Sequence, residues 1–217
     1  MQDELFTDDC AAGGATLLLA PGAWLLPGWG VKVEAELLQS LAGVMTAAPP
    51  QQMTTPGGQA MSVAMTHCGR LGWWSDRRGY RYEPAHPATG QSWPAMPECF
   101  ATLAREAAAE AGFDAFEPDS CLINRYVPGA RMSLHQDKDE KDLTAPIVSV
   151  SLGLPVVFLW GGLQRSDRAQ RIPLHHGDVV VWGGPSRLAF HGVAPLVAGH
   201  HPQLGPQRIN LTFRRAG

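Results

Sequence analysis

The 217-residue sequence predicts a mostly β protein of the α+β class, in which an antiparallel sandwich or jelly roll is backed by N-terminal helices. Two observations predict this class. The chain holds 24 Gly and 18 Pro scattered along its length, which favours many short elements joined by turns. From residue 120 onward the apolar residues also change from a period of 3.6 to a period of 2. With 45% apolar residues, a chain of this length can fold as one domain without disulfides or a structural metal.

Two helices are predicted before the main run of strands. In Val33–Met45 leucine and valine recur at helical spacing, and the run ends before two consecutive prolines. The second helix, Glu98–Ala111, follows Pro97, is rich in alanine and ends at Gly112. We expect both helices to cover a sheet rather than to carry catalytic residues.

The second half of the chain predicts at least five strands, with no helix between them. Gly153 and Pro155 interrupt one apolar run, so we expect a bend or a bulge at that point. Strands that follow one another without intervening helices pair antiparallel, which excludes a parallel α/β sheet. The runs are Leu122–Val127, Ile147–Trp160, Asp178–Trp182, Leu188–Val193 and Arg208–Arg214.

Charge is distributed unevenly along the chain. The net charge is −3, but residues 1–60 hold six acidic side chains against Lys32 alone, whereas the rest of the chain holds 14 acidic and 16 basic side chains. The acidic bias therefore belongs to the N-terminal segment, and the net charge does not exclude a nucleic-acid partner.

The cysteines and the first apolar run indicate the cellular compartment. The four cysteines are far apart and form no Cys-x-x-Cys pair, so neither a zinc ribbon nor a redox dithiol is predicted. The run Ala15–Leu26 is broken by Pro21 and Gly22 and follows acidic residues, so it is neither a signal peptide nor a membrane span. We expect a cytoplasmic, monomeric protein with reduced thiols and no membrane partner.

The last predicted strand has two chemically different faces. Two interpretations are open at this point: the polar face belongs to a solvent-exposed edge strand, or its two guanidinium groups face an interior cavity and bind an anion. The polar face carries Arg208, Asn210, Thr212 and Arg214, and the apolar face carries Ile209, Leu211 and Phe213.

A second motif joins two histidines and a carboxylate. His135 and Asp137 lie two residues apart, so in an extended backbone their side chains point the same way. His191 stands 54 residues further along, on a different predicted strand. Two histidines and one carboxylate without cysteine match the facial triad of non-haem Fe(II) sites, which leaves coordination positions open. A His-x-Asp pair alone is common by chance, so the remaining residues must support the interpretation.

Together these motifs resemble the AlkB family of alkylation-repair dioxygenases, which use Fe(II), 2-oxoglutarate and O₂. The resemblance extends from about Leu17 to the C-terminus and rests on Asn124-Arg125-Tyr126, His135–Asp139, His191 and Arg208–Arg214. It implies a tail over residues 1–16 and a single domain over residues 17–217. Within that domain it implies a nucleotide-recognition lid at about residues 50–90 and a double-stranded β-helix (jelly-roll) core at about residues 118–217.

The resemblance also implies roles for individual residues. His135, Asp137 and His191 would bind the iron and form the catalytic centre, and Arg208 would pair with the distal carboxylate of 2-oxoglutarate. Trp182 corresponds to an aromatic residue near the iron, to which we assign packing rather than catalysis. The rest of the co-substrate pocket would consist of Asn124, Tyr126, Asn210 and Arg214.

A further set of residues would contact the substrate. The aromatic face of Trp73 would stack on a flipped base, and Asp139 would complement the positive charge of a methylated base. Loop packing is the alternative for the aromatic residues, and a solvated basic face is the alternative for the arginines. The implied substrate residues are Thr55, Trp73, Tyr80, Arg81, Tyr82, Asp139 and Arg165.

The implied activity is oxidative demethylation of N1-methyladenine and N3-methylcytosine in DNA, with release of formaldehyde, succinate and CO₂. Single strands are the expected substrate, because proteins usually bind them by stacking on the bases and by pairing positive side chains with the phosphates. Double-stranded DNA or RNA are further candidate partners. Two alternatives are a demethylase of RNA or tRNA with the same chemistry, and a non-catalytic jelly-roll module that binds nucleic acid.

Overall fold

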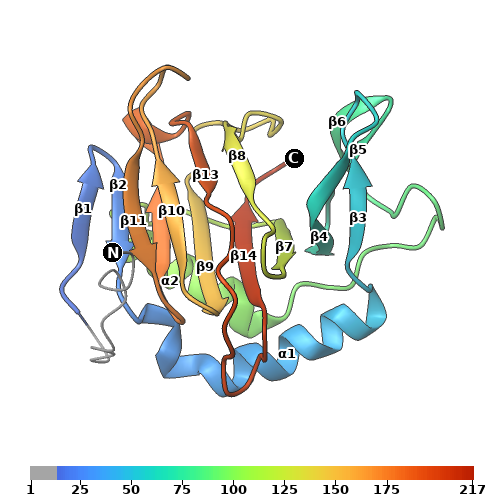
Figure 1. The fold of residues 1–217 in the computed structure, drawn as a ribbon, viewed down its shortest axis with the longest axis horizontal. Helices are drawn as coiled ribbons and strands as arrows, with labels where there is room; N and C mark the ends of the chain where they lie inside the picture. The colour runs from blue at the N-terminus through green and yellow to red at the C-terminus, as the bar shows by residue number, and fades with distance from the viewer. Residues whose placement is uncertain (1–13) are drawn as a thin grey trace.

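The computed structural model describes residues 14–217, so most of the predicted tail, residues 1–16, lies outside the described residues. Two antiparallel sheets and one hairpin contain the strands (Figure 1). The large sheet has eight strands, in the spatial order β1 (Leu17–Ala20), β2 (Ala23–Leu26), β12 (Val179–Trp182), β9 (Ile147–Gly153), β14 (Arg208–Arg214), β7 (Ser120–Tyr126), β4 (Ala60–Gly69) and β3 (Gln51–Thr54). The small sheet has four, in the order β11 (Gln170–Leu174), β10 (Val156–Trp160), β13 (His191–Val193) and β8 (Met132–His135).

Helices cover one face of the large sheet, as predicted. They are α1 (Glu34–Ala47) and α2 (Glu98–Glu110), with a short 3-10 helix, η1 (Trp29–Val33), before α1. The apolar side chains of β14 pack into this layer, and Phe213 meets Phe100 of α2 edge to face, with ring centroids 6.0 Å apart. Both predicted helices are therefore confirmed, each within two residues of its expected ends.

The other face of the large sheet packs against the small sheet, which gives the jelly-roll core its second hydrophobic layer. Tyr126 and Trp182 from the large sheet share this layer with Phe158 and Trp160 from the small one. All seven residues of β14 are buried, and β14 lies between β7 and β9. The interpretation of β14 as an edge strand with a solvated polar face is therefore wrong, because its polar side chains point into the interior.

Two predicted strands are divided or shortened in the structure. The run Ile147–Trp160 forms β9 and β10, and the expected bend between them is confirmed at Gly153, which ends β9 at φ +91°, where a Cβ would lie 2.5 Å from the carbonyl oxygen of Gln207. Strand β13 begins at His191 rather than at Leu188. The preceding residues form a turn around the 3-10 helix η2 (Gly184–Ser186), and the amide of Ala189 donates to the carbonyl of Ser186 at 2.9 Å.

A separate hairpin, β5 (Gly72–Asp76) and β6 (Gly79–Glu83), stands beside β3 and β4 on the right-hand side of Figure 1. The hydroxyl of Ser75 donates to the carbonyl of Thr54 at 2.7 Å and so ties the hairpin to β3. Strands β3 and β4 lie inside the residue range expected for the lid, yet β4 pairs with β7 and so extends the large sheet. Only the hairpin and the loop after it lie outside that sheet.

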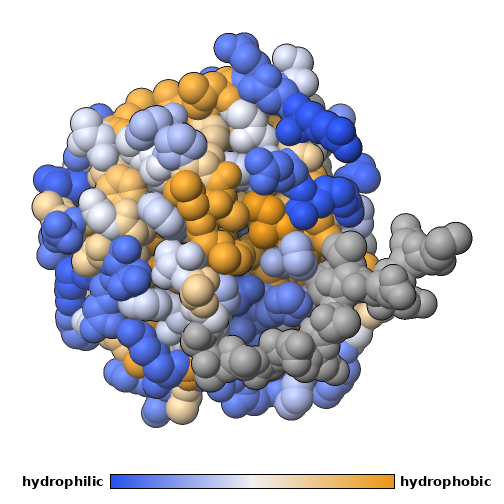
Figure 2. Space-filling view, turned by 90° about the vertical axis from the view of Figure 1, so that its left-hand side faces the viewer, coloured by the Kyte–Doolittle hydropathy of each residue, from blue (hydrophilic) through white to orange (hydrophobic). Residues whose placement is uncertain are grey.

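On the opposite side of the molecule, β1 forms one of the two edges of the large sheet, and β3 forms the other. Leu17 and Leu18 on this strand are about half exposed. Figure 2 views the molecule from that side and shows apolar side chains gathered in a central patch bordered by hydrophilic ones. Among residues 14–217, no helix is long and apolar enough to cross a membrane.

Candidate active site

The three predicted iron ligands converge at the pairing of β8 with β13. His135 ends β8 and is the register partner of His191, which begins β13, and Asp137 follows two residues after His135. One ligand atom from each residue lies within 4.8 Å of the others. The Nε2 atoms of His135 and His191 are 3.6 and 3.9 Å from the carboxylate oxygens of Asp137. This spacing allows one cation to contact all three side chains.

Backbone carbonyls fix the orientation of both imidazole rings. The Nδ1 atom of His135 lies 2.9 Å from the carbonyl of Ser133, and that of His191 lies 3.1 Å from the carbonyl of Ala189. A carbonyl can only accept, so each Nδ1 carries the proton and donates it. The Nε2 lone pair of each ring then faces the centre of the cluster, which is the usual arrangement of a metal-binding histidine.

The charges around the cluster keep it in the form that binds a metal. Burial alone would raise the pKa of Asp137, but Arg214, His191 and His135 outweigh burial and lower the pKa well below its usual range. Burial and the neighbouring His135 lower the pKa of His191 to about 4. At neutral pH the cluster therefore offers a carboxylate and a neutral imidazole, which are the protonation states that metal binding requires.

Aromatic side chains enclose the cluster on the side of His191. The ring of Trp182 lies 4.9 Å from that of His191, and Phe158 lies 6.1 Å from it. The side chain of His191 is 7% exposed, whereas that of His135 is 35% exposed, so the site opens to solvent on the side of His135. Trp182 is buried in the core, which agrees with the packing role expected for it.

Arg208 supplies a buried positive charge that fits an anionic co-substrate. Its Nη2 donates to the hydroxyl of Ser151 at 2.8 Å, and its guanidinium lies over the ring of Tyr126 at 5.0 Å. Among residues 14–217 its Nε and Nη1 have no hydrogen-bond partner, and burial lowers its pKa. Because an unpaired buried guanidinium is costly, these two donors fit one carboxylate, such as the distal carboxylate of 2-oxoglutarate.

The other predicted co-substrate residues are buried and are held by contacts with protein groups. Asn210 is saturated by protein groups: its amide donates to Ser149 and to the carbonyl of Val150, and its oxygen accepts from Asn124 and Thr212. These contacts indicate that Asn210 orients the side chain of Asn124. Tyr126 is buried, which raises its pKa, and its hydroxyl lies 3.8 Å from the sulfur of Met132. Arg214 contacts Asp137 at 2.6 Å.

Three predicted substrate residues lie together on the hairpin and the loop after Asp137. The indole nitrogen of Trp73 donates to a carboxylate oxygen of Asp139 at 2.8 Å. The ring of Trp73 stacks on that of Tyr80, with centroids 5.4 Å apart and planes 14° apart. Because Asp139 lies two residues after the predicted iron ligand Asp137, this assembly places an aromatic face and a carboxylate beside the metal cluster.

Three more of the predicted substrate residues are held by other contacts. Arg81 makes a two-pronged ion pair with Asp76 and a second ion pair with Glu83, so its guanidinium is already engaged within the hairpin. Arg165 is exposed and donates to the carbonyl of Leu134 at 2.8 Å, which keeps it next to β8. The hydroxyl of Thr55 accepts from the amide of Gln59 at the turn between β3 and β4.

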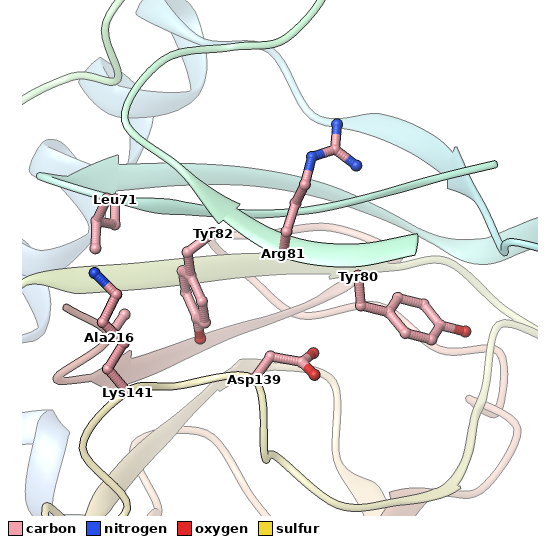
Figure 3. A pocket seen from close by; sticks show the side chains of 7 residues that line it. All are labelled: Leu71, Tyr80, Arg81, Tyr82, Asp139, Lys141 and Ala216. Atoms are coloured by element: carbon pink, nitrogen blue, oxygen red, sulfur yellow. The ribbon is translucent and has the colours of Figure 1, made fainter. Parts of the chain in front are cut away.

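A cavity of about 340 Å³ lies between β6 and the loop after Asp137 (Figure 3). In this view Tyr80 and Tyr82 point from β6 toward the loop that carries Asp139 and Lys141, and the guanidinium of Arg81 points to the opposite side of the strand. The cavity thus brings two aromatic rings, a carboxylate and an ammonium group together.

Two residues at the site were not predicted from the sequence. Glu140 and Arg187 form a buried ion pair at 3.1 Å, and Glu140 also contacts Arg214 at 3.3 Å. The position of Glu140, three residues after Asp137, was the only signal in the sequence that could have indicated it. Nothing local distinguishes Arg187 from any other arginine, because its partners lie more than 40 residues away in the chain.

The fold and the site thus define a class of protein: a jelly roll with a two-histidine, one-carboxylate cluster and a buried arginine for an anionic co-substrate. The family model described as the 2OG-Fe(II) oxygenase superfamily matches residues 22–214. The chain belongs to this superfamily and, as its relatives show, to the AlkB dioxygenases within it.

Those relatives match nearly the whole chain. The alpha-ketoglutarate-dependent dioxygenase AlkB of Salmonella typhimurium is 59% identical over 91% of this chain and 92% of its own length. The Escherichia coli protein of the same name is 56% identical, over 92% of each. The solved structure of OsALKBH1 superposes with a TM-score of 0.79 at 28% identity, covering 93% of this chain and 100% of its own. The chain is therefore a dioxygenase that uses Fe(II), 2-oxoglutarate and O₂.

Proposed function

We propose that the protein removes methyl groups oxidatively from N1-methyladenine and N3-methylcytosine in DNA, that it prefers single strands, and that it releases formaldehyde, succinate and CO₂. The observation that carries this proposal is the assembly of Trp73, Tyr80 and Asp139 beside the metal cluster. Both methylated bases are cations. An aromatic face next to a carboxylate suits such a base better than it suits a neutral one.

In this proposal His135, Asp137 and His191 hold Fe(II), and Arg208 holds the distal carboxylate of 2-oxoglutarate. Bound together, the metal and the co-substrate supply the activation of O₂ that oxidises a methyl C–H bond. The protein contributes position and environment. The carbonyls of Ser133 and Ala189 aim the two imidazoles, and Trp182 and Phe158 keep water from the side of His191.

The hairpin would recognise the damaged base. A methylated base that cannot form its normal pairs costs little to flip out of a helix, and it could then enter beside Trp73. Tyr80 is 49% exposed, so its ring is accessible to a nucleotide. Arg77, Arg78, Arg131 and Lys138 are exposed around the hairpin and the cluster and would contact phosphates. Arg81 is paired with Asp76, and we assign it a role in shaping the hairpin.

An RNA or tRNA demethylase is the second candidate. Two more distant relatives, which match shorter stretches of the chain, carry substrate names: a DNA N(6)-methyladenine demethylase of Arabidopsis thaliana and a tRNA demethylase of Schizosaccharomyces pombe. The hairpin residues recognise the base and its charge rather than the sugar, so this chemistry would serve either nucleic acid.

A comparison of DNA and RNA substrates tests the proposal. Two single-stranded oligonucleotides of the same sequence, one DNA and one RNA, each with a single N3-methylcytosine, are incubated in separate reactions with the protein, Fe(II), ascorbate and 2-oxoglutarate, and formaldehyde is measured in each. An unmethylated strand is the control. We expect formaldehyde from the methylated DNA in excess over the RNA. Turnover of the RNA alone would favour the second candidate, and binding without formaldehyde from either strand would favour a non-catalytic module.

A further inference from the structure

The loop that carries the iron ligand Asp137 is fastened to the core by Arg187. The side chain of Arg187, 4% exposed, uses three nitrogens: Nη1 donates to the carbonyl of Asp137 at 2.7 Å, Nε donates to the carbonyl of Ala145 at 2.8 Å, and Nη2 meets Glu140 at 3.1 Å. One planar guanidinium thus joins both ends of the loop to the turn at η2. Its fork geometry cannot be reproduced by a point charge.

Glu140 balances the charges around Asp137. Its side chain is 2% exposed and contacts Arg187 through one oxygen and Arg214 through the other. Arg214 also contacts Asp137 at 2.6 Å, so two buried guanidinium groups face two buried carboxylates. Without the charge of Glu140, Asp137 would be the single buried carboxylate left beside these two guanidinium groups, in contact with Arg214, and the cluster would carry one more positive charge. A more positive cluster binds a divalent cation less well.

Glu140 also links the metal cluster to the hairpin. The hydroxyl of Tyr82 on β6 donates to Glu140 at 2.7 Å, and Tyr82 lines the cavity shown in Figure 3. A continuous path of polar contacts therefore leads from Tyr82 through Glu140 and Arg214 to Asp137.

We propose that Glu140 and Arg187 are positioning residues of the metal site: Glu140 keeps Arg214 from withdrawing the Asp137 carboxylate from the metal, and Arg187 holds the backbone of Asp137 in place. The inference rests on the proposed metal site. Groups that orient metal ligands typically change metal affinity about 10- to 100-fold when they are removed. We expect changes of this size although neither side chain belongs to the ligand triad.

The test measures Co(II) binding in the absence of 2-oxoglutarate and nucleic acid, by titration of the visible absorption of the metal. Glu140→Gln keeps the shape of the side chain and removes its charge, and we expect it to weaken Co(II) binding by about 10- to 100-fold and to change the absorption band. Glu140→Asp restores the charge and should recover at least part of the loss. Arg187→Lys keeps the charge but loses the fork, and we expect roughly 10-fold weaker binding.

Glu98→Gln is the matched control. Glu98 also pairs with an arginine, Arg105, but on the exposed surface of α2, so its loss should leave Co(II) binding unchanged. Native Co(II) affinity in both folded Glu140→Gln and folded Arg187→Lys would overturn the inference. If Glu140→Gln does not fold, Arg187→Lys decides alone. A failure of the metal site itself looks different, because His135→Ala would then bind Co(II) as tightly as the native protein.

Discussion

Replacing Arg208 by methionine should separate co-substrate binding from folding. Two donors of the buried guanidinium, Nε and Nη1, have no partner among residues 14–217 and are available to a carboxylate. Hydrogen bonds to charged groups are worth about 1.5–3 kcal/mol each, so the pair contributes about 3–6 kcal/mol to binding. Arg208→Met should therefore weaken the binding of the co-substrate, with a Kd raised by roughly 10²- to 10⁴-fold.

The same substitution should leave the free protein stable. The guanidinium is buried without a carboxylate partner, and an apolar side chain of similar length avoids that cost. The substitution also removes the hydrogen bond to Ser151 and the contact of the guanidinium with the ring of Tyr126, and these losses lower the stability. We expect the free energy of unfolding without co-substrate to stay within about 1 kcal/mol of native or to rise. Truncation of an ordinary large core side chain costs about 2–5 kcal/mol.

Calorimetric titration of the co-substrate into Co(II)-loaded protein without O₂ measures the first quantity, and urea unfolding of the metal-free protein measures the second. Arg125→Met is the matched control, because Arg125 lies on the neighbouring strand β7, is exposed and contacts Gln207. It should leave co-substrate binding unchanged. A Kd for Arg208→Met within about threefold of native would refute the assignment of Arg208 as the carboxylate partner.

Three further predictions concern the metal, the base and pH. His135→Ala should abolish succinate release while the circular dichroism spectrum stays native, and native activity would remove His135 from the metal site. Asp139→Ala should lower the preference in kcat/KM for a cationic over a neutral methylated base by about 5- to 10-fold, since the carboxylate acts on the charge of the base. The Michaelis constant for the co-substrate should stay unchanged. An equal loss of kcat/KM for both bases would indicate a structural role. Burial lowers the pKa of His67 from 6.5 to about 3, so the folded state resists a proton that the unfolded state takes up, and stability is lost as pH falls from 6.5 toward 3. The loss at pH 5 amounts to about 2 kcal/mol, and His67→Leu should reduce the drop in unfolding free energy between pH 7 and pH 5 by about that amount, whereas an unchanged drop would contradict it.

Local patterns in the sequence were sufficient to predict the central strand of the large sheet and the pair of ligands at the end of β8. The alternation in β14 separated the residues that pack on the helices from those that point between the sheets, because a strand exposes successive side chains to opposite faces. The His-x-Asp pair indicated two ligands for the same reason. Strand β4 has no such alternation, since Met65–Cys68 is buried on both faces, and its pattern therefore did not distinguish a strand of the large sheet from part of the lid.

Features that depend on contacts between residues far apart in the chain could not be predicted from local sequence patterns. Glu140 and Arg187 are ordinary charged residues in the sequence, and only the packing of the loop after Asp137 against η2 makes them a buried pair. For Arg81 the sequence predicted a contact with the substrate, and the structure adds an ion pair with Asp76 across the turn of the hairpin. Asp76 lies five residues before Arg81 in the sequence, so this pair could have been predicted from the hairpin sequence.

The fate of the methyl group tests the central claim most directly. Single-stranded DNA with one N3-methylcytosine, isotopically labelled in the methyl carbon, is incubated with the protein, Fe(II), 2-oxoglutarate and O₂, and the strand, formaldehyde and succinate are quantified by mass spectrometry. We predict restored cytosine, labelled formaldehyde and succinate in equal amounts, with none of the three from His135→Ala. Succinate together with an unchanged strand and no labelled formaldehyde would contradict the proposed substrate, and absence of succinate would contradict the metal and co-substrate site itself.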